Sequence, residues 1–371
     1  MKKLGFRQCV ADPCLWVYDD GQGYITISTW VDDCIVAYND AAIWKQLFDK
    51  MAMKYPISAK GRLDFCLGMA VRQNSNRTVV ELDQSKYVDD MCAGFPNQLR
   101  GKDLFAGKYR IPAVHGQKYE KALLPEGSEP LVDSRYRELL GKLTYLASWT
   151  RPDISTIVSM LARHQNEPHA IHWKALVHVL VYCKMTKEKC IRFSAPDGAS
   201  DDHLNLLGYV DADYAGCVDT SRSRTGFLFM CCGAPIVWRT VLQPIVAQST
   251  MESEYVAANA CAREAEWCRL LYDDILGGNV GVDHSMPVAL YEDNESCIAL
   301  AKNFMISKRS RHIRIRFHYV RQQIRDGVIV LEKIKGTENP ADAFTKVLAE
   351  NLFSKYQNVL VRPPIVPKND L

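Results

Sequence analysis

Four acidic residues stand at the ends of expected strands and helices in the second half of the chain. Asp211 and Asp293 each end a strand-like run, Glu254 lies near the start of a long helical segment, and Asp342 begins the last helical segment. Three or four converging carboxylates suit a pair of Mg²⁺ ions, because Mg²⁺ prefers hard oxygen ligands to cysteine or histidine. Two such ions, about 3.5–4 Å apart, can activate a water molecule and stabilise a leaving oxyanion, as phosphodiester hydrolysis requires.

Neighbouring acidic residues compete for these positions. Glu252 precedes Glu254 by two residues, so on a helix it points about 200° away, and only one of the two can face the site. Asp213 shares a strand face with Asp211 and remains an alternative first ligand. Glu292 is expected to face the opposite side from the aspartate that follows it. Without metal the converging carboxylates repel one another, so some of their pKa values should be raised.

The segment that holds these residues is expected to form a mixed sheet flanked by helices. Runs of β-branched and aromatic residues predict strands, and helical spacing of apolar residues predicts helices. The strands are expected at 204–212, 225–232, 235–240, 288–291 and 328–334, and the helices at 250–276, 294–302 and 310–325, with a last one beginning near Pro340. In an α/β fold of this kind, strand ends are natural positions for catalytic side chains.

The first half of the chain combines strands and helices in a different order, so the expected fold class of the whole chain is α/β together with α+β. Residues 14–18 and 24–31 predict a hairpin, and residues 34–38 predict a further strand after Asp32 and Asp33. The remaining expected elements are a helix at 41–54, strands at 64–72 and 78–82, a helix at 84–93, a loop at 94–130, and helices at 134–149, 154–164 and 170–186. A hairpin without preceding elements cannot bury both faces, so the N-terminus is expected to be the middle of a larger domain.

Length and composition indicate a globular protein of two or three domains. The 371 residues are 47% hydrophobic and 24% charged, which is ordinary for a folded soluble protein. The longest apolar run, residues 175–183, is far shorter than the roughly 20 residues of a membrane span, and the N-terminus has no apolar signal segment. The 13 cysteines are scattered and are expected to be reduced thiols. The net charge of +3 is too small to establish a nucleic-acid partner by itself.

Residues 204–348 resemble the ribonuclease H domain of copia-type long-terminal-repeat retrotransposons. The blocks that match are 209–216, 219–226, 249–257, 291–294, 311–321 and 339–346. The resemblance implies a mixed five-stranded sheet flanked by helices, two Mg²⁺ ions and an RNA–DNA hybrid as substrate. It also implies that the catalytic and metal-binding residues are Asp211, Glu254, Asp293 and Asp342. Many cellular ribonucleases H have a histidine in the loop before the last carboxylate, whereas residues 335–340 contain none.

The upstream part resembles the reverse transcriptase of the same elements. Residues 4–6, 12–14 and 31–33 match its palm, and residues 136–146 and 150–154 match the segment that joins polymerase to nuclease. The resemblance implies that Asp32 and Asp33 lie at a hairpin tip that holds metal, although the family usually has tyrosine where Trp30 stands. A polymerase also needs an earlier aspartate and fingers, which 31 residues cannot supply. We therefore expect a truncated palm that does not polymerise by itself.

A strongly basic segment follows the fourth expected strand of the nuclease-like region. Residues 302–325 contain eight lysines and arginines and no acidic residue, which suits contact with a phosphate backbone. A solvated helix face is the alternative. The expected nucleic-acid-binding residues are Lys308, Arg309, Arg311, His312, Arg314, Arg316, His318 and Arg321. Binding through the backbone and 2′-hydroxyls would be independent of base sequence.

These observations give one expected organisation and two hypotheses for function. The expected regions are a partial reverse-transcriptase palm at 1–95, a linker at 96–133, a helical thumb or connection region at 134–200, a ribonuclease H-like domain at 201–348 and a tail at 349–371. Within that tail, the Pro-rich residues 361–368 are expected to be unpacked. The first hypothesis is Mg²⁺-dependent cleavage of the RNA strand of RNA–DNA hybrids. The alternative is an inactive nucleic-acid-binding relic. A complete reverse transcriptase in trans is a candidate partner, and the cytoplasm is the expected location because such elements copy their RNA in cytoplasmic particles.

Overall fold

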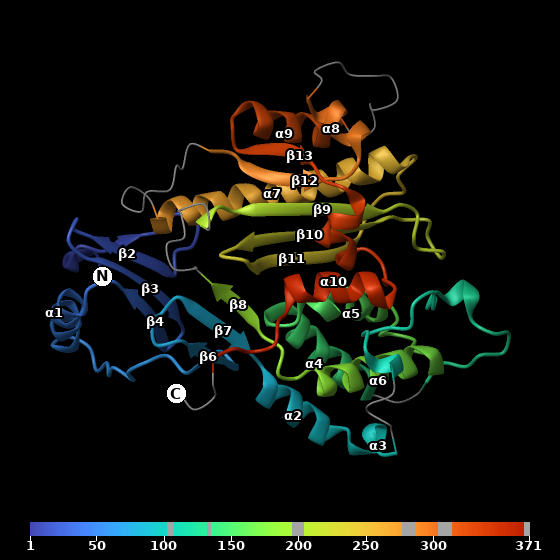
Figure 1. Ribbon diagram of the computed structural model, residues 1–371, viewed down its shortest axis with the longest axis horizontal. Helices are drawn as coiled ribbons and strands as arrows, with labels where there is room; N and C mark the ends of the chain where they lie inside the picture. Colours follow the sequence, from blue (N-terminus) through green and yellow to red (C-terminus); the bar gives the residue numbers. More distant parts are fainter. Residues whose placement is uncertain (102–106, 132–134, 195–203, 277–285, 303–313, 367–371) are drawn as a thin grey trace.

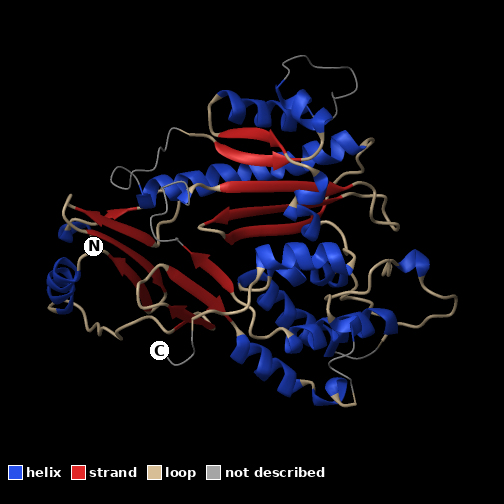
Figure 2. Ribbon diagram, viewed as in Figure 1, coloured by secondary structure: helices blue, strands red, loops and turns tan. Residues whose placement is uncertain are grey.

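Three sheets and the helices between them make up the chain. The computed structural model describes residues 1–101, 107–131, 135–194, 204–276, 286–302 and 314–366. The strand orders of the sheets are β1-β2-β3-β4, β5-β6-β7-β8 and β11-β10-β9-β12-β13. Figure 1 shows the first two sheets near the N-terminus and the third between two groups of helices, and Figure 2 shows the same layers by secondary structure. No helix in the described part of the chain has the length and apolar character needed to cross a bilayer.

The first sheet confirms the expected hairpin. Its antiparallel strands and the helix after them are β1 (Arg7–Gln8), β2 (Leu15–Asp19), β3 (Tyr24–Trp30), β4 (Asp33–Tyr38) and α1 (Ala41–Ala52). The side chain of Asp40 caps α1 by accepting hydrogen bonds from the amides of Ala42 and Ile43. The buried core between sheet and helix is small and consists of Phe6, Ile25, Ile27, Leu47 and Met51.

The second sheet joins segments that lie far apart in the sequence. Its strands are β5 (Phe65–Cys66), β6 (Met69–Gln73), β7 (Val79–Asp83) and β8 (Ile191–Ser194). The single strand expected at 64–72 is a hairpin, because Leu67 and Gly68 both have positive φ and reverse the chain. Strand β8 was not expected, since its four residues are too few for their alternation of apolar and polar side chains to stand out, and they pair with β7 across more than a hundred residues.

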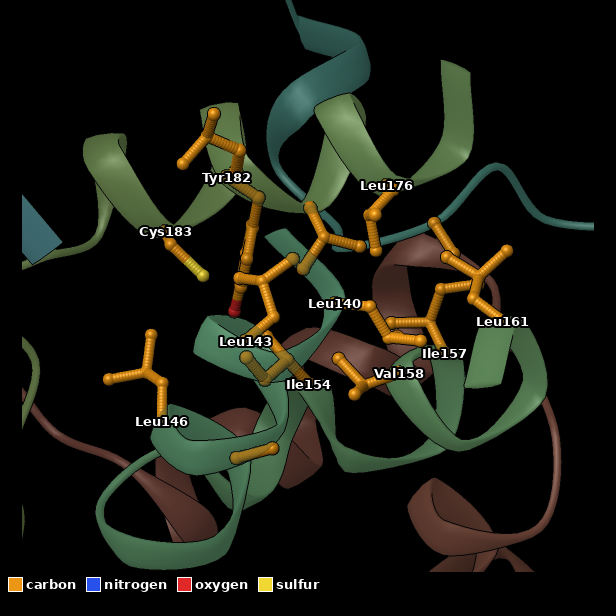
Figure 3. Close-up of a cluster of buried hydrophobic side chains, with 14 of the residues drawn as sticks. Leu140, Leu143, Leu146, Ile154, Ile157, Val158, Leu161, Leu176, Tyr182 and Cys183 are labelled. Carbon is orange, nitrogen blue, oxygen red and sulfur yellow. The ribbon is translucent and has the colours of Figure 1, made fainter. Parts of the chain in front are cut away.

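The helical block is built around one apolar core. Its helices are α2 (Ser85–Gly94), α3 (Pro96–Leu99), α4 (Arg135–Trp149), α5 (Ser155–Ala162), α6 (Ala170–Met185) and α10 (Glu350–Leu360). Figure 3 shows α4, α5 and α6 directing leucine, isoleucine and valine side chains toward one another. The expectation that the Pro-rich residues after 360 are unpacked is wrong for residues 361–366. Phe353 and Tyr356 of α10 are buried in this core, and Val361 and Val366 beyond the helix are also buried.

The third sheet is the mixed five-stranded sheet that the sequence predicts. Its strands and helices are β9 (Leu207–Asp213), β10 (Arg224–Cys231), β11 (Ala234–Leu242), α7 (Thr250–Leu276), β12 (Val288–Glu292), α8 (Glu295–Lys302), α9 (Arg314–Arg325) and β13 (Ile329–Lys333). Strands β9, β10 and β11 are antiparallel, whereas β12 runs parallel to β9 and to β13. The helix expected near Pro340 is a short 3-10 helix, Pro340–Phe344, and the following α-helix begins only at Glu350.

Strand β10 connects two cores because alternate side chains enter opposite faces of the sheet. Phe227 and Phe229 pack in the core under α7, while Leu228 and Met230 pack in the core of the helical block. Side chains of α5 and α10 belong to the core on one face of this sheet, and side chains of α7 belong to the core on the other. The sheet is therefore covered on both faces, and the helices before it in the sequence form one of its covers.

A buried ion pair anchors the helical block. Arg151 donates from Nε to Oδ1 and from Nη2 to Oδ2 of Asp153, both at 2.8 Å, and both residues are fully or nearly fully buried. Tyr182 donates to the same carboxylate, and Gln357 of α10 donates to Tyr182. Burial opposes the charge of Asp153, yet Arg151 holds the pKa of Asp153 below its ordinary value. The pair therefore joins α6 and α10 at the point where the chain leaves α4.

We predict that Asp153→Ala destabilises the protein by about 3–5 kcal/mol, because it leaves Arg151 charged and unpaired in the interior. Asp89 provides the control, since its ion pair with Lys187 is at the surface. Asp89→Ala should cost less than about 1 kcal/mol. Urea unfolding followed by circular dichroism measures both, and equal losses for the two variants would contradict this account.

Candidate metal centre

Three of the four expected carboxylates meet at one edge of the third sheet. Asp211 lies on β9, Asp293 directly follows β12, and Glu254 lies in the first turns of α7. One carboxylate oxygen from each of the three lies within 4.8 Å of the others. Parallel pairing of β9 with β12 brings two of these residues to the same edge, and α7 crosses that edge with its N-terminal end.

The fourth carboxylate comes from the 3-10 helix after β13. Asp342 is buried and is the charged neighbour that acts most strongly on Asp211, but it lies outside the group of three. The Asn339 side chain fixes this segment, accepting from the amide of Ala341 at 3.1 Å and donating to the carbonyl of Val210 at 2.8 Å. The segment thus lies directly over β9, with Asp342 beside Asp211.

Gly226 permits this close approach. A Cβ atom at position 226 would lie 2.9 Å from the backbone carbon of Phe344 and 2.7 Å from the Thr345 methyl group. The Thr345 hydroxyl donates to Oδ2 of Asp211. A residue without a side chain on β10 therefore lets the last segment reach the aspartate of the neighbouring strand.

Burial and mutual repulsion perturb the protonation of the cluster. Burial, and next the charge of Asp342, raise the pKa of Asp211 to about 6. Burial, and next the charge of Glu292, raise the pKa of Glu254 to about 11. The pKa of Asp293 is also raised, first by burial and then by Asp211. Carboxyl groups perturbed in this way are poised to gain a cation.

The donor set fits a hard divalent cation. All three converging groups offer carboxylate oxygens, which Mg²⁺ prefers. Within the described residues, Oε2 of Glu254 is buried and has no hydrogen-bond partner. A buried oxygen of this kind is costly unless a proton or a metal ion satisfies it. Hydrogen bonds among the described residues therefore leave one oxygen of the cluster unsatisfied, and a bound cation or proton would satisfy it.

The structure separates the competing acidic residues. Glu252 accepts a hydrogen bond from the amide of Gln248, and its own amide donates to Ser249, so it caps the start of α7. Asp213 lies against Gly216, and burial raises its pKa. Neither belongs to the group of three converging carboxylates.

Glu292 is the residue whose influence sequence reasoning missed. Because side chains alternate along β12, Glu292 points to the opposite face of the sheet from Asp293. Helix α7 covers that face, and the charge of Glu292 there raises the pKa of Glu254. Its side chain is fully buried; Oε1 accepts from the amide of Asn294, and Oε2 has no hydrogen-bond partner among the described residues. The pKa of Glu292 is raised, chiefly by burial. The available signal was the alternation of the strand, because Glu292 shares a face with the apolar Val288 and Leu290, both of which are buried.

Asp32 and Asp33 lie elsewhere, where β3 turns into β4 in the first sheet. Both are exposed, and Val31 before them has a positive φ of 52°. In the described part of the chain no third carboxylate, histidine or cysteine joins them in a metal-binding group. The structure thus confirms the expected hairpin tip but does not bring this pair to the cluster at Asp211.

The expected nucleic-acid-binding residues divide into three sets. Outside the described residues lie Lys308, Arg309, Arg311 and His312. Arg314 and Arg316 begin α9, where His318 is exposed. Arg321 does not fit the expectation: it is buried, and its guanidinium donates to the carbonyl of Leu300 at the end of α8. It therefore joins two helices and does not present its charge to a backbone.

Comparison with known proteins identifies relatives over nearly the whole chain. No protein-family model matches it. It is 30% identical over 357 residues to the retrovirus-related Pol polyprotein from transposon TNT 1-94 of Nicotiana tabacum, covering 95% of this chain and 26% of that relative. It is 28% identical over 365 residues to the Pol polyprotein from transposon RE2 of Arabidopsis thaliana, covering 97% and 24%. The chain spans about a quarter of the length of these relatives.

Solved structures that resemble the chain match only part of it. An RNase H1 isolated from compost by a metagenomic approach covers 39% of this chain and 96% of its own, with 16% identity and a TM-score of 0.30.

We predict that metal-free stability falls as pH rises through about 6. The pKa of Asp211 is higher in the folded state, at about 6, than its ordinary value of 3.8. Its protonation therefore stabilises the fold fully below pH 3.8 and no longer does so once pH exceeds about 6. Asp211→Asn should remove about 1–3 kcal/mol of the stability difference between about pH 5 and about pH 8. Urea unfolding in EDTA measures it, with the exposed Asp49→Asn as control; equal pH dependence in both variants would contradict the assignment.

Proposed function

Because the chain belongs to the retrovirus-related Pol polyproteins from copia-type transposons, we propose that residues 204–348 act as a ribonuclease H. The substrate would be the RNA strand of an RNA–DNA hybrid, and the cofactor two Mg²⁺ ions. The single observation that supports this most is the convergence of Asp211, Glu254 and Asp293 within 4.8 Å. Spread over more than eighty residues of sequence, they meet only because the sheet and α7 bring them together.

The residues of the chain would hold the metal and orient its ligands. Asp211, Glu254, Asp293 and Asp342 are the proposed ligands, and the metal when bound would supply an activated water and stabilise the leaving oxygen. The Thr345 hydroxyl orients the Asp211 carboxylate by donating to it. Such supporting hydrogen bonds fix the geometry of ligands and tune their affinity.

The basic segment other than Arg321 is proposed to contact the hybrid. Arg316 and His318 lie on α9, the helix that follows α8 in the chain. Lys308, Arg309, Arg311, His312 and Arg314 are proposed to share this role. Contacts to phosphates position the nucleic acid without reading its bases.

The N-terminal sheet is proposed to be part of a reverse-transcriptase palm. Asp32 and Asp33 at its hairpin tip would be the residues nearest to polymerase chemistry. Because the described residues offer them no third ligand, we do not assign polymerase activity to this chain alone. A complete reverse transcriptase in trans would be its natural partner.

We predict that Asp293→Asn lowers cleavage of a labelled RNA–DNA hybrid at least about a hundredfold, the scale on which loss of one electrostatic stabiliser acts. Binding of the hybrid should be retained, because removing a negative charge reduces repulsion of phosphates. Cleavage on a gel and fluorescence anisotropy measure the two quantities, with Asp49→Asn as control and EDTA as the metal-free arm. Duplex DNA and single-stranded RNA should stay intact. Folded wild-type protein that leaves the hybrid uncut in Mg²⁺ would favour an inactive nucleic-acid-binding relic.

A further inference from the structure

One positively charged side chain enters the carboxylate cluster. The ammonium of Lys346 lies 2.8 Å from Oδ1 of Asp342. Its charge also acts on Asp211, Asp213 and Asp293. The Asp342 side chain is 10% exposed and that of Lys346 is 44% exposed. The ammonium therefore reaches a mostly buried carboxylate, while the lysine side chain as a whole remains partly open to solvent.

The local backbone dictates this pairing. The amides of Thr345 and Lys346 both donate to the carbonyl of Asp342, so the chain makes one helical turn there. A turn of this kind places residues i and i+4 side by side. One short segment thus delivers a carboxylate, the Thr345 hydroxyl on Asp211 and an ammonium to the same site.

Asp342 lies next to the three converging carboxylates but is not one of them, and its ion pair with Lys346 is consistent with that position. Asp211, Glu254 and Asp293 already have oxygens within 4.8 Å of one another, whereas Asp342 does not join them. Its Oδ1 faces the ammonium at 2.8 Å, and the positive charge there makes the carboxylate a poorer ligand for a metal ion. A divalent cation that uses this oxygen therefore competes with Lys346 for it.

The other lysine beside the cluster makes different contacts. Lys333 donates to the backbone carbonyl of Asp293 and lies 3.6 Å from Oε1 of Glu295. No contact between Lys333 and a carboxylate of the cluster is found in the described part of the chain. Lys346 is thus the lysine placed to compete for a ligand oxygen.

We propose that Lys346 is a positioning residue that occupies Asp342 in the metal-free protein and sets the affinity for divalent metal by competing for that carboxylate. This inference rests on the proposed metal site. In the metal-free state the ammonium offsets repulsion among the carboxylates and stabilises the fold. On metal binding it must give up its ion pair, which weakens the apparent affinity by the free energy of that pair.

Calorimetric titration of the full chain with Mg²⁺, after removal of metal with EDTA, tests the competition. Lys346→Gln should bind Mg²⁺ about threefold to tenfold more tightly than wild type, in line with the strength of a partly exposed ion pair. Lys346→Arg keeps the charge and should bind more weakly than Lys346→Gln. The control is Lys355→Gln, which removes the same charge from a lysine that donates to the carbonyl of Thr337 and contacts no carboxylate of the cluster; its affinity should match wild type.

Thermal unfolding gives a second readout that does not depend on activity. Lys346→Gln should have a lower Tm than wild type in EDTA, and the difference should shrink at saturating Mg²⁺. Equal or weaker Mg²⁺ binding by Lys346→Gln, with wild type binding the metal, would overturn the competition and leave the metal site standing. Absence of Mg²⁺ binding in all the folded variants would overturn the metal site itself, and this inference with it.

Discussion

Repulsion among buried carboxyl groups is the constraint on which the C-terminal architecture depends. Asp211, Glu254, Glu292, Asp293 and Asp342 gather at one corner of a sheet, where burial raises the pKa of the first four. Such a cluster opposes folding unless its surroundings are rigid or a cation is present. The two covered faces of the sheet supply the rigidity, because α7 packs on one and the helical block on the other. A carboxylate cluster of this kind is held together by the packing around it.

The helical block is held together by a buried ion pair, and this explains how the helices stay packed on the second face of the third sheet. The Arg151–Asp153 pair is satisfied from several directions, including Tyr182 and, through it, Gln357 of α10. Thr156 of α5 donates to the carbonyl of Ala343, next to Asp342 in the chain. Helix α5 of the same helical block therefore supports the segment that delivers the fourth carboxylate.

Much of this arrangement could be predicted from sequence, and the rest could not for physical reasons. The strands around Asp211 and the helix over 250–276 follow from periodicity, which is a local property. Strand β8 was missed because its pairing with β7 is decided by contacts remote in sequence. The effect of Glu292 on Glu254 was missed because alternation predicts the face of the sheet to which a side chain points, but not which helix packs on that face. The ion pair of Asp342 with Lys346 depends on a single turn, which no period of apolar residues reveals.

The C-terminal segment has a consequence for how the molecule can be divided. Arg362 forms a β-bridge with Cys190 before β8, and the amide of Ile365 donates to the buried Glu81 of β7. The end of the chain thus returns to the sheet begun near residue 65, as Figure 1 shows. Segments that lie far apart in the sequence are therefore neighbours in space. A fragment that begins after residue 200 would lack the helices that pack on α10 and the residues that pair with Arg362 and Ile365. The natural unit of cooperative folding includes both the nuclease-like sheet and the helices that precede it.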